Sequence, residues 1–243
     1  MIFGFLTAAV VGFLLTASAN WTGTRGPHGL QLIIGFTLFL LARVVFWTTP
    51  FTSLWVYQVL GALVPLFLVL HLARLFIKTN NKRNMILLVP LSALVFGQIA
   101  ILSSNYVLGY ELSLFSVRFL VVVIAGRVLP FFTRSAITME PKWDYPYLEK
   151  LNILCVFLLI FEPFYHYTNA IGSQVWVVLT FLALVLNSYR FINWRFIASF
   201  EVKILFILYV AYLWLPVHFA LSLASHFGWL SELGRPALHS LSY

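Results

Sequence analysis

Long apolar runs follow one another along the whole chain, and only short connections separate them. A helix needs about 20 consecutive apolar residues to cross the hydrocarbon core of a bilayer, and eight runs meet this condition. The connections leave no room for a soluble domain, so the pattern predicts an all-α fold: a polytopic transmembrane helical bundle in one domain over residues 1–243. The eight predicted spans are roughly 1–19, 29–48, 52–77, 85–104, 109–133, 148–167, 173–192 and 203–228.

The composition excludes the soluble and the disordered classes. Hydrophobic residues make up 62% of the chain and charged residues 9%, with a mean hydropathy of +0.96, whereas soluble domains are about a quarter charged. An aromatic share of 18% is too high for a disordered chain. The net charge of +8 comes without a basic cluster interleaved with aromatic residues on a soluble element. We therefore expect membrane lipid, and no nucleic acid, as a partner.

Both ends of the chain need an interpretation. A ninth helix begins at Pro236, but the residues that follow cover only about 12 Å, against a hydrocarbon core of roughly 30 Å. At the other end, Ala17-Ser18-Ala19 has the form of a signal-peptidase site. No basic residue precedes the first apolar run, which favours a retained helix over a cleaved signal peptide.

The basic residues predict the orientation of the chain. Cytoplasmic connections of membrane proteins are enriched in Lys and Arg. With the N-terminus outside, eleven of these residues fall on the inner side and only Arg235 on the outer side. The inner residues are Arg25, Arg74, Lys78, Lys82, Arg83, Arg134, Lys142, Lys150, Arg190, Arg195 and Lys203.

Three arginines lie inside or at the edge of predicted spans. A charge near the bilayer centre costs about 2.5–3.5 kcal/mol on insertion scales, so such a residue normally faces the bundle interior. Arg43 and Arg127 lie near helix ends, where snorkelling to the membrane surface is the alternative. Arg118 is deeper, and Glu111, seven residues earlier on the same face, is its candidate counter-charge.

The histidines gather toward the predicted outer side, where His166, His218, His226 and His239 all lie. Neutral imidazole is the usual ligand of haem iron and copper, and a bundle can bring histidines of different helices together. Glu162 precedes His166 by one helical turn and could orient its ring. The alternative for each histidine is a hydrogen bond to a headgroup, a water molecule or a backbone carbonyl.

Signatures of soluble enzymes are absent from the sequence. It has no nucleophile elbow, no phosphate-binding loop and no dinucleotide fingerprint, and its seven acidic residues are scattered. The sequence leaves open whether the activity is enzymatic, and it favours a non-enzymatic role.

The most unusual string is Gly126-Arg127-Val128-Leu129-Pro130-Phe131-Phe132-Thr133. Pro130 predicts a kink or the end of the helix, and Arg127 makes the string a candidate anion site. The string resembles the signature of the NnrS family, bacterial membrane proteins of the response to nitric oxide that contain haem and copper. Further similar stretches, in the same order, are Met1–Phe5, Gly12–Ala17, Asn20–Gly23, Lys82–Asn84, Arg190 with Trp194, Tyr212–Trp214 and His239–Ser242.

The resemblance implies a haem- and copper-containing protein of the bacterial inner membrane that acts in nitrosative stress, with nitric oxide as a small-molecule ligand. It suggests His239 as the first metal ligand, with His218 and His166 behind it. Arg127 and Arg43 would then be structural or would face the haem propionates, a role inferred from their charge and depth.

Two departures from the family pattern accompany the resemblance. Family members have a histidine-rich stretch before the position of Met1 and several helices after His239–Ser242, so we expect a chain that is shortened at both ends. Tyr209 stands where many members have a histidine, which puts a ligand at that position in doubt.

Two other functions remain open on the residues alone. A transporter or channel for a small solute would use Arg118 and Glu111 to line a polar path, and it would need no chromophore. A cofactor-free membrane scaffold would fit if the shortened chain lacks the metal site.

Overall fold

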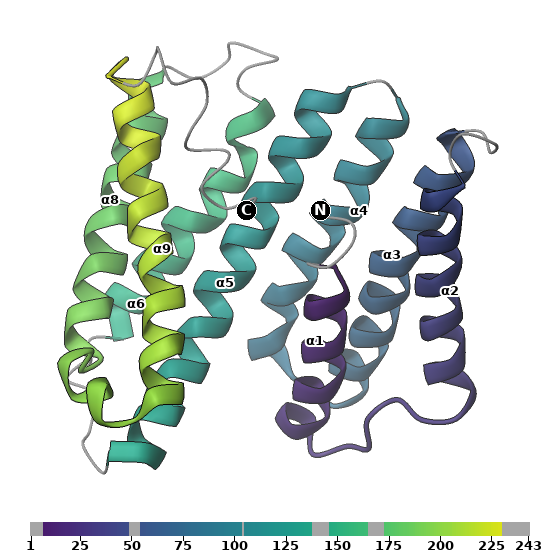
Figure 1. The fold of residues 1–243 in the computed structure, drawn as a ribbon, viewed down its shortest axis with the longest axis horizontal. Coiled ribbons are helices and arrows are strands. Elements are labelled where there is room, and N and C mark those ends of the chain that lie inside the picture. The colour runs from purple at the N-terminus through teal and green to yellow at the C-terminus, as the bar shows by residue number, and fades with distance from the viewer. Residues whose placement is uncertain (1–6, 49–53, 104, 138–145, 165–172, 230–243) are drawn as a thin grey trace. The chain divides into compact units, whose positions relative to one another are not determined.

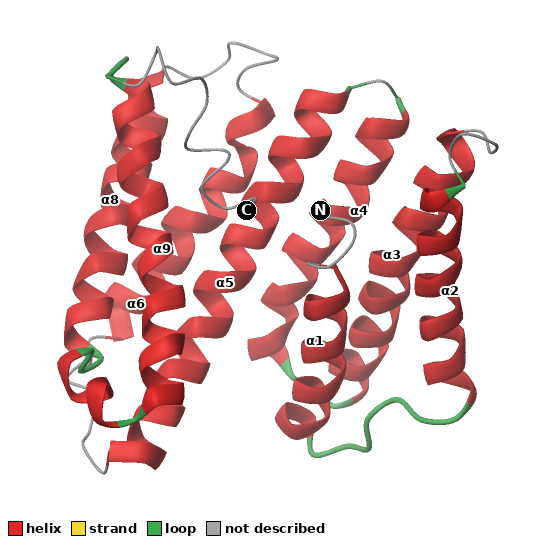
Figure 2. Cartoon of the chain, viewed as in Figure 1, coloured by secondary structure: helices red, strands yellow, loops and turns green. Residues whose placement is uncertain are grey.

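In the computed structural model, residues 7–48, 54–103, 105–137, 146–164 and 173–229 are described. These residues form helices joined by turns and loops, with no strand among them, which confirms the all-α prediction (Figure 2). The chain divides into two compact units, Met1–Ser116 and Val117–Tyr243, and each is described by itself. The prediction of one domain over the whole chain stays a prediction.

The first unit is a set of helices packed around α3 (Leu54–Lys78). Helix α3 contacts α1, α2 and α4, and Figure 1 shows it between α1 and α2. The loop from α1 to α2 and the turn from α3 into the short 3₁₀-helix η2 lie at the same end of the unit. The other elements are α1 (Thr7–Thr22), α2 (Leu30–Trp47), η2 (Lys82–Leu87) and α4 (Leu88–Leu102). Helix α5 (Tyr106–Ile137) belongs to this unit only as far as Ser116.

Glycines let helices of the first unit approach closely. A Cβ atom on Gly97 of α4 would overlap Ser113 Oγ and lie 2.9 Å from the Gly109 carbonyl oxygen, both on α5. A Cβ atom on Gly61 of α3 would lie 2.9 Å from Gln98 Nε2. Small residues at such crossings allow the dense packing that holds membrane helices together.

The second unit contains the rest of α5 and the helices that follow it. Helix α8 packs against both α6 and α9. Helix α5 continues through Pro130 to Ile137, so it does not end at the proline. The further elements are α6 (Pro146–Leu158), the 3₁₀-helix η3 (Leu159–Phe161), α8 (Ser173–Asn193), the 3₁₀-helix η4 (Ile197–Glu201) and α9 (Lys203–His226).

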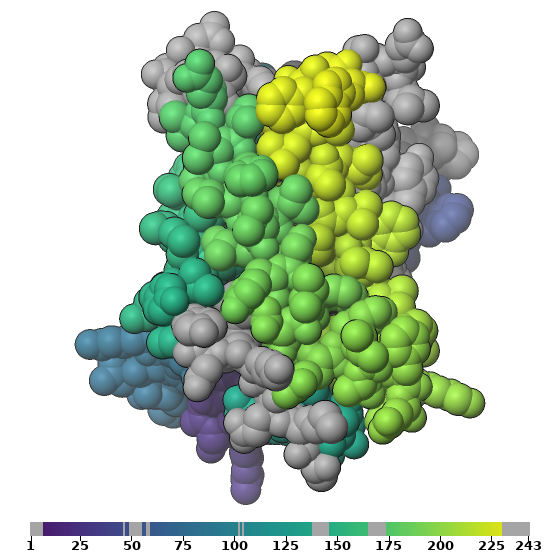
Figure 3. All heavy atoms as spheres, turned by 90° about the vertical axis from the view of Figure 1, so that its left-hand side faces the viewer, coloured from purple at the N-terminus to yellow at the C-terminus, as the bar shows by residue number. Residues whose placement is uncertain are grey.

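Helix α8 separates an apolar surface from a polar interior. Its exposed side chains include Val178, Phe181 and Ile192, whereas Asn187 and Arg190 are fully buried. Figure 3 shows the surface that α8 and α9 form together in this unit. This inverted pattern, with apolar residues outside and polar residues inside, suits a helix with lipid on its outer side.

Among the residues that the structure describes, five helical segments are long and apolar enough to cross a membrane, which fits a membrane protein. They are Val59–Lys78, Lys82–Ile101, Tyr106–Ile137, Gln174–Asn193 and Lys203–His226. Each of the eight predicted spans contains a helix, but α1, α6 and the apolar part of α2 are shorter. The count of eight spans is therefore not confirmed, and the start of a ninth at Pro236 lies outside the described residues.

Candidate functional site

A buried arginine and a buried histidine meet in the second unit. Arg118 of α5 and His218 of α9 are 1% and 2% exposed, and Arg118 Nη1 lies 3.3 Å from His218 Nε2. Arg118 Nη2 also lies 3.5 Å from the Leu159 carbonyl oxygen, at the start of η3. The Phe219 ring lies below the guanidinium, with its centroid 5.3 Å from Arg118 Cζ. Three elements thus meet at one guanidinium.

The contact between Arg118 and His218 determines which ring nitrogen carries the proton. A guanidinium has only donors, so Arg118 donates and Nε2 of His218 must accept. The neutral imidazole then holds its proton on Nδ1. His218 is therefore a neutral imidazole, the form in which histidine binds metal ions, and its accepting nitrogen points at Arg118.

A second imidazole lies toward the end of α9. His226 Nε2 is 3.3 Å from Glu162 Oε1, and the two side chains are 25% and 9% exposed. Because His226 follows His218 by eight residues, about two helical turns, the two histidines lie on the same side of α9. Glu162 also interacts electrostatically with Arg118. We call Arg118, Glu162, His218 and His226, together with the Leu159 carbonyl, the Arg118 cluster.

A second polar group, which we call the Arg190 network, lies toward the other end of α9. Arg190 Nη2 pairs with Glu149 Oε1 at 3.0 Å, and Arg190 Nη1 donates to Asn187 Oδ1 at 3.4 Å. Asn187 and Asn152 exchange amide hydrogen bonds of 3.2 and 2.8 Å, and the Tyr212 hydroxyl donates to Asn187 Oδ1 at 2.8 Å. The members are Glu149, Asn152, Asn187, Arg190 and Tyr212.

The NnrS family model, described as NnrS protein, matches residues 1–243. The chain belongs to the NnrS family. No curated protein matches this NnrS-family chain, and no solved structure does.

The first residue of the NnrS signature contacts the Arg190 network. A Cβ atom on Gly126 would overlap Arg190 Nη2 and lie 2.8 Å from Glu149 Oε1. The signature glycine thus makes room for an ion pair whose arginine is fully buried. Asn187 and Arg190, spaced one turn apart in an apolar run, were the signal in the sequence that could have revealed the network.

The arginines of the sequence prediction lie in different places. Arg127 is half-buried on α5, nine residues or about 13 Å along the helix from Arg118. Arg43 is half-buried on α2, in the first unit, where its Cζ atom lies 5.6 Å from the centroid of the Phe39 ring. The arginine that meets a histidine is Arg118, for which the sequence suggested Glu111 as the partner.

The predicted metal ligands are only partly described. His218 lies in the Arg118 cluster, whereas His166 and His239 lie outside the described residues. Over the part of the chain that the structure describes, no group of three or more His, Cys, Asp or Glu side chains could hold a metal ion. The described residues thus do not complete a metal site by themselves, and the ligand assignment stays a prediction.

Proposed function

We propose that this NnrS-family protein contains haem and copper and acts in the bacterial response to nitric oxide and nitrosative stress. The family match over residues 1–243 is the observation that carries the proposal. The Arg118 cluster supports it, because it offers a neutral imidazole next to a guanidinium inside an apolar bundle. An imidazole can serve as an axial ligand of haem iron, and a guanidinium can pair with a haem propionate.

In this proposal His218 supplies one imidazole, and His239 and His166 supply the others. Arg118 would hold a haem propionate, and His218 would offer Nε2 to the metal. Arg127 and Arg43 keep the structural or propionate-facing roles that their charges suggest. When bound, the metals supply a centre at which nitric oxide can bind. The chain itself contributes the imidazoles, the counter-charge and an apolar surrounding that excludes water.

The proposed location is the bacterial inner membrane, with the N-terminus of this chain outside. The excess of Lys and Arg in alternate connections supports this orientation. It brings the Arg118 cluster toward the outer side and the Arg190 network toward the inner side.

Absorption spectroscopy and metal analysis of the purified full chain test the proposal. We expect a Soret band, with iron and copper in stoichiometric amounts, and a reduced haem content in His218→Gln, His166→Ala and His239→Ala. Glutamine at position 218 keeps an acceptor for Arg118, so that a loss of haem is not simply a loss of folding. The matched control is His28→Ala, because His28 is exposed in the loop before α2, where its Nδ1 lies 2.9 Å from the Gly26 carbonyl oxygen.

The outcomes separate this proposal from the other candidate functions. An unchanged haem content in all three variants would refute the ligand assignment. Solute flux in liposomes without a chromophore would favour a transporter. If the iron and copper contents of this chain are near zero but a version with additional flanking sequence contains both metals, the chain by itself is a cofactor-free membrane scaffold.

Labelling from one side of the membrane tests the orientation. In a Cys155→Ala background, a membrane-impermeant maleimide should label Ser225→Cys at the end of α9 in cells with a permeabilised outer membrane. Lys78→Cys, at the end of α3, should react only after the inner membrane is opened. Both native side chains are exposed, so a difference in labelling reports the side of the membrane rather than burial.

A further inference from the structure

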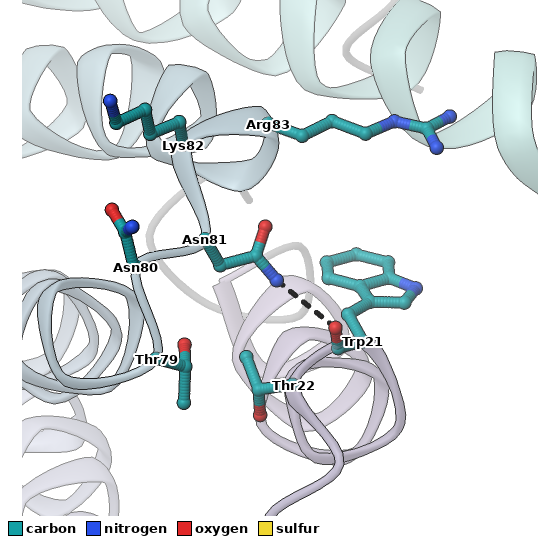
Figure 4. A pocket seen from close by; sticks show the side chains of 7 residues that line it. All are labelled: Trp21, Thr22, Thr79, Asn80, Asn81, Lys82 and Arg83. Atoms are coloured by element: carbon teal, nitrogen blue, oxygen red, sulfur yellow. Dashed lines mark hydrogen bonds between the residues drawn. The ribbon is translucent and has the colours of Figure 1, made fainter.

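An open hollow of about 450 Å³ lies at one end of the first unit, between the end of α1 and the turn from α3 into η2. Figure 4 shows its side chains, with Lys82 on the side of Asn80 and Arg83 on the side of Trp21. Asn81 Nδ2 donates to the Trp21 carbonyl oxygen at 3.0 Å and so ties the turn to α1. The lining residues are Trp21, Thr22, Thr79, Asn80, Asn81, Lys82 and Arg83.

The charge around this hollow is strongly positive. Lys82 and Arg83 line it, and Arg74 and Lys78 are exposed on the last turns of α3 that lead to it. The sequence of the first unit contains a single acidic residue, Glu111, which lies near the beginning of α5, at the far end of α4 from η2. The charged residues of this unit are therefore almost all basic.

Most of the uncharged polar groups of the hollow are already bound to the backbone. Thr22 Oγ1 donates to the Ser18 carbonyl at 2.7 Å, and Thr79 Oγ1 donates to the Leu75 carbonyl at 2.9 Å. These groups shape the wall of the hollow, and the attraction for a ligand comes from the two cations. Figure 4 shows the two side chains extending in opposite directions from η2, so both must turn toward the hollow to bind one oxyanion such as a phosphate group.

The surroundings of the hollow are those of a membrane surface. Ile77, two residues before the lining residue Thr79, is 68% exposed on α3, and Leu70 is 50% exposed two turns earlier. An indole such as that of Trp21 is typical of the interface between headgroups and acyl chains. A phosphate in the hollow would therefore lie beside an apolar helix surface that suits acyl chains.

From this arrangement we propose that the hollow binds the phosphate group of an anionic phospholipid, held by Lys82 and Arg83. Basic pockets between membrane helices recognise lipid headgroups in this way. The proposal involves only the first unit and does not rest on the haem proposal. A free phosphate ion shares the same chemistry, so the experiment needs one arm for each source.

The experiment measures lipid binding to the purified full chain by native mass spectrometry, with titrations of dioleoylphosphatidylglycerol and dioleoylphosphatidylcholine. One cation near a membrane surface changes the affinity for anionic lipid by about fivefold, so Lys82→Gln/Arg83→Gln should weaken phosphatidylglycerol binding by about 25-fold. The matched control is Arg134→Gln/Lys203→Gln, which removes the same two charges from exposed positions on other helices. It should change binding by less than about threefold.

A second pair of variants tests the hollow without removing a cation. Asn80 has a positive φ of 49°, which Asp and Gly also tolerate, so Asn80→Asp and Asn80→Gly should both fold. Asn80→Asp adds a carboxylate at the hollow and should weaken phosphatidylglycerol binding about fivefold relative to Asn80→Gly. Far-UV circular dichroism and the thermal midpoint check the fold of each variant.

The arms of the experiment distinguish the sources of phosphate. Phosphatidylglycerol binding that depends on Lys82 and Arg83 and exceeds phosphatidylcholine binding supports the lipid. If only inorganic phosphate binds, with the same dependence on these two residues, the phosphate site holds and its lipid source is overturned. Equal losses in the Lys82/Arg83 and Arg134/Lys203 variants would overturn the site itself, since the effect would then follow net charge alone.

Discussion

The substitution Gly126→Ala tests whether the NnrS signature glycine exists to accommodate the Arg190–Glu149 ion pair. The added methyl group would overlap Arg190 Nη2 and lie 2.8 Å from Glu149 Oε1. The guanidinium cannot swing into open space, because Arg190 is fully buried, with Nη2 3.4 Å from the Val122 carbonyl oxygen and Nη1 3.4 Å from Asn187 Oδ1. Either the helices must separate or the ion pair must break.

The size of the effect follows from three terms. Overpacking in a close-packed interior costs about 1–3 kcal/mol, and loss of one partner of a buried ion pair costs about 3–5 kcal/mol. Alanine gains about 0.5–1 kcal/mol over glycine in a helix interior. Because the overlap involves the charged ends of both partners, we expect a net loss of about 2–4 kcal/mol in the free energy of unfolding.

The assay is reversible unfolding of the full chain in mixed micelles with increasing sodium dodecyl sulfate, followed by far-UV circular dichroism. The matched control is Gly12→Ala in α1, because a Cβ atom there meets nothing within 4 Å. The control isolates helix propensity and should be neutral or stabilising by up to about 1 kcal/mol. If Gly126→Ala behaves like Gly12→Ala, our explanation of the signature glycine is wrong.

Three further outcomes are expected. His218→Leu should destabilise the chain by about 1–3 kcal/mol, because it removes one acceptor of the buried Arg118 guanidinium while the Leu159 carbonyl remains, and His218→Gln, which keeps an acceptor, should cost less; equal losses in the same unfolding assay would contradict this reasoning. Tyr212→Phe should cost about 1 kcal/mol, since Asn187 Oδ1 keeps its other donors, and a loss above 3 kcal/mol would exclude a single hydrogen bond as the cause. The thiol of Cys155, which is 2% exposed, should resist maleimide in the folded chain and react fully after denaturation; rapid labelling of folded protein would contradict its burial.

The spacing of apolar residues predicted the helices well, since each predicted span contains one. The end of α5 was not predictable from Pro130 alone. Proline removes one backbone hydrogen bond, and a packed bundle can tolerate that loss, so α5 continues to Ile137. Hydropathy also predicted spans at α1 and α6, whose described helices are Thr7–Thr22 and Pro146–Leu158, and the structure does not confirm these two as full spans.

The candidate site was only partly predictable. Depth in the bilayer singled out Arg118 and His218 separately, because a buried charge or imidazole in an apolar run demands a partner. It could not pair them, because they are a hundred residues apart in the chain. Glu111 was the partner suggested for Arg118, since sequence spacing within one helix is the only geometry that a sequence supplies.

Hydropathy and motif content, both readable from the printed sequence, determined the helical membrane character of this protein and its membership in the NnrS family. These properties depend on local composition and on the order of residues, which do not change with the fold. Tertiary structure decided that Arg118 meets His218, that Glu162 meets His226, and that Gly126 makes room for Arg190 and Glu149. Each of these contacts joins residues from separate helices, and only the packing of those helices sets the distance between them.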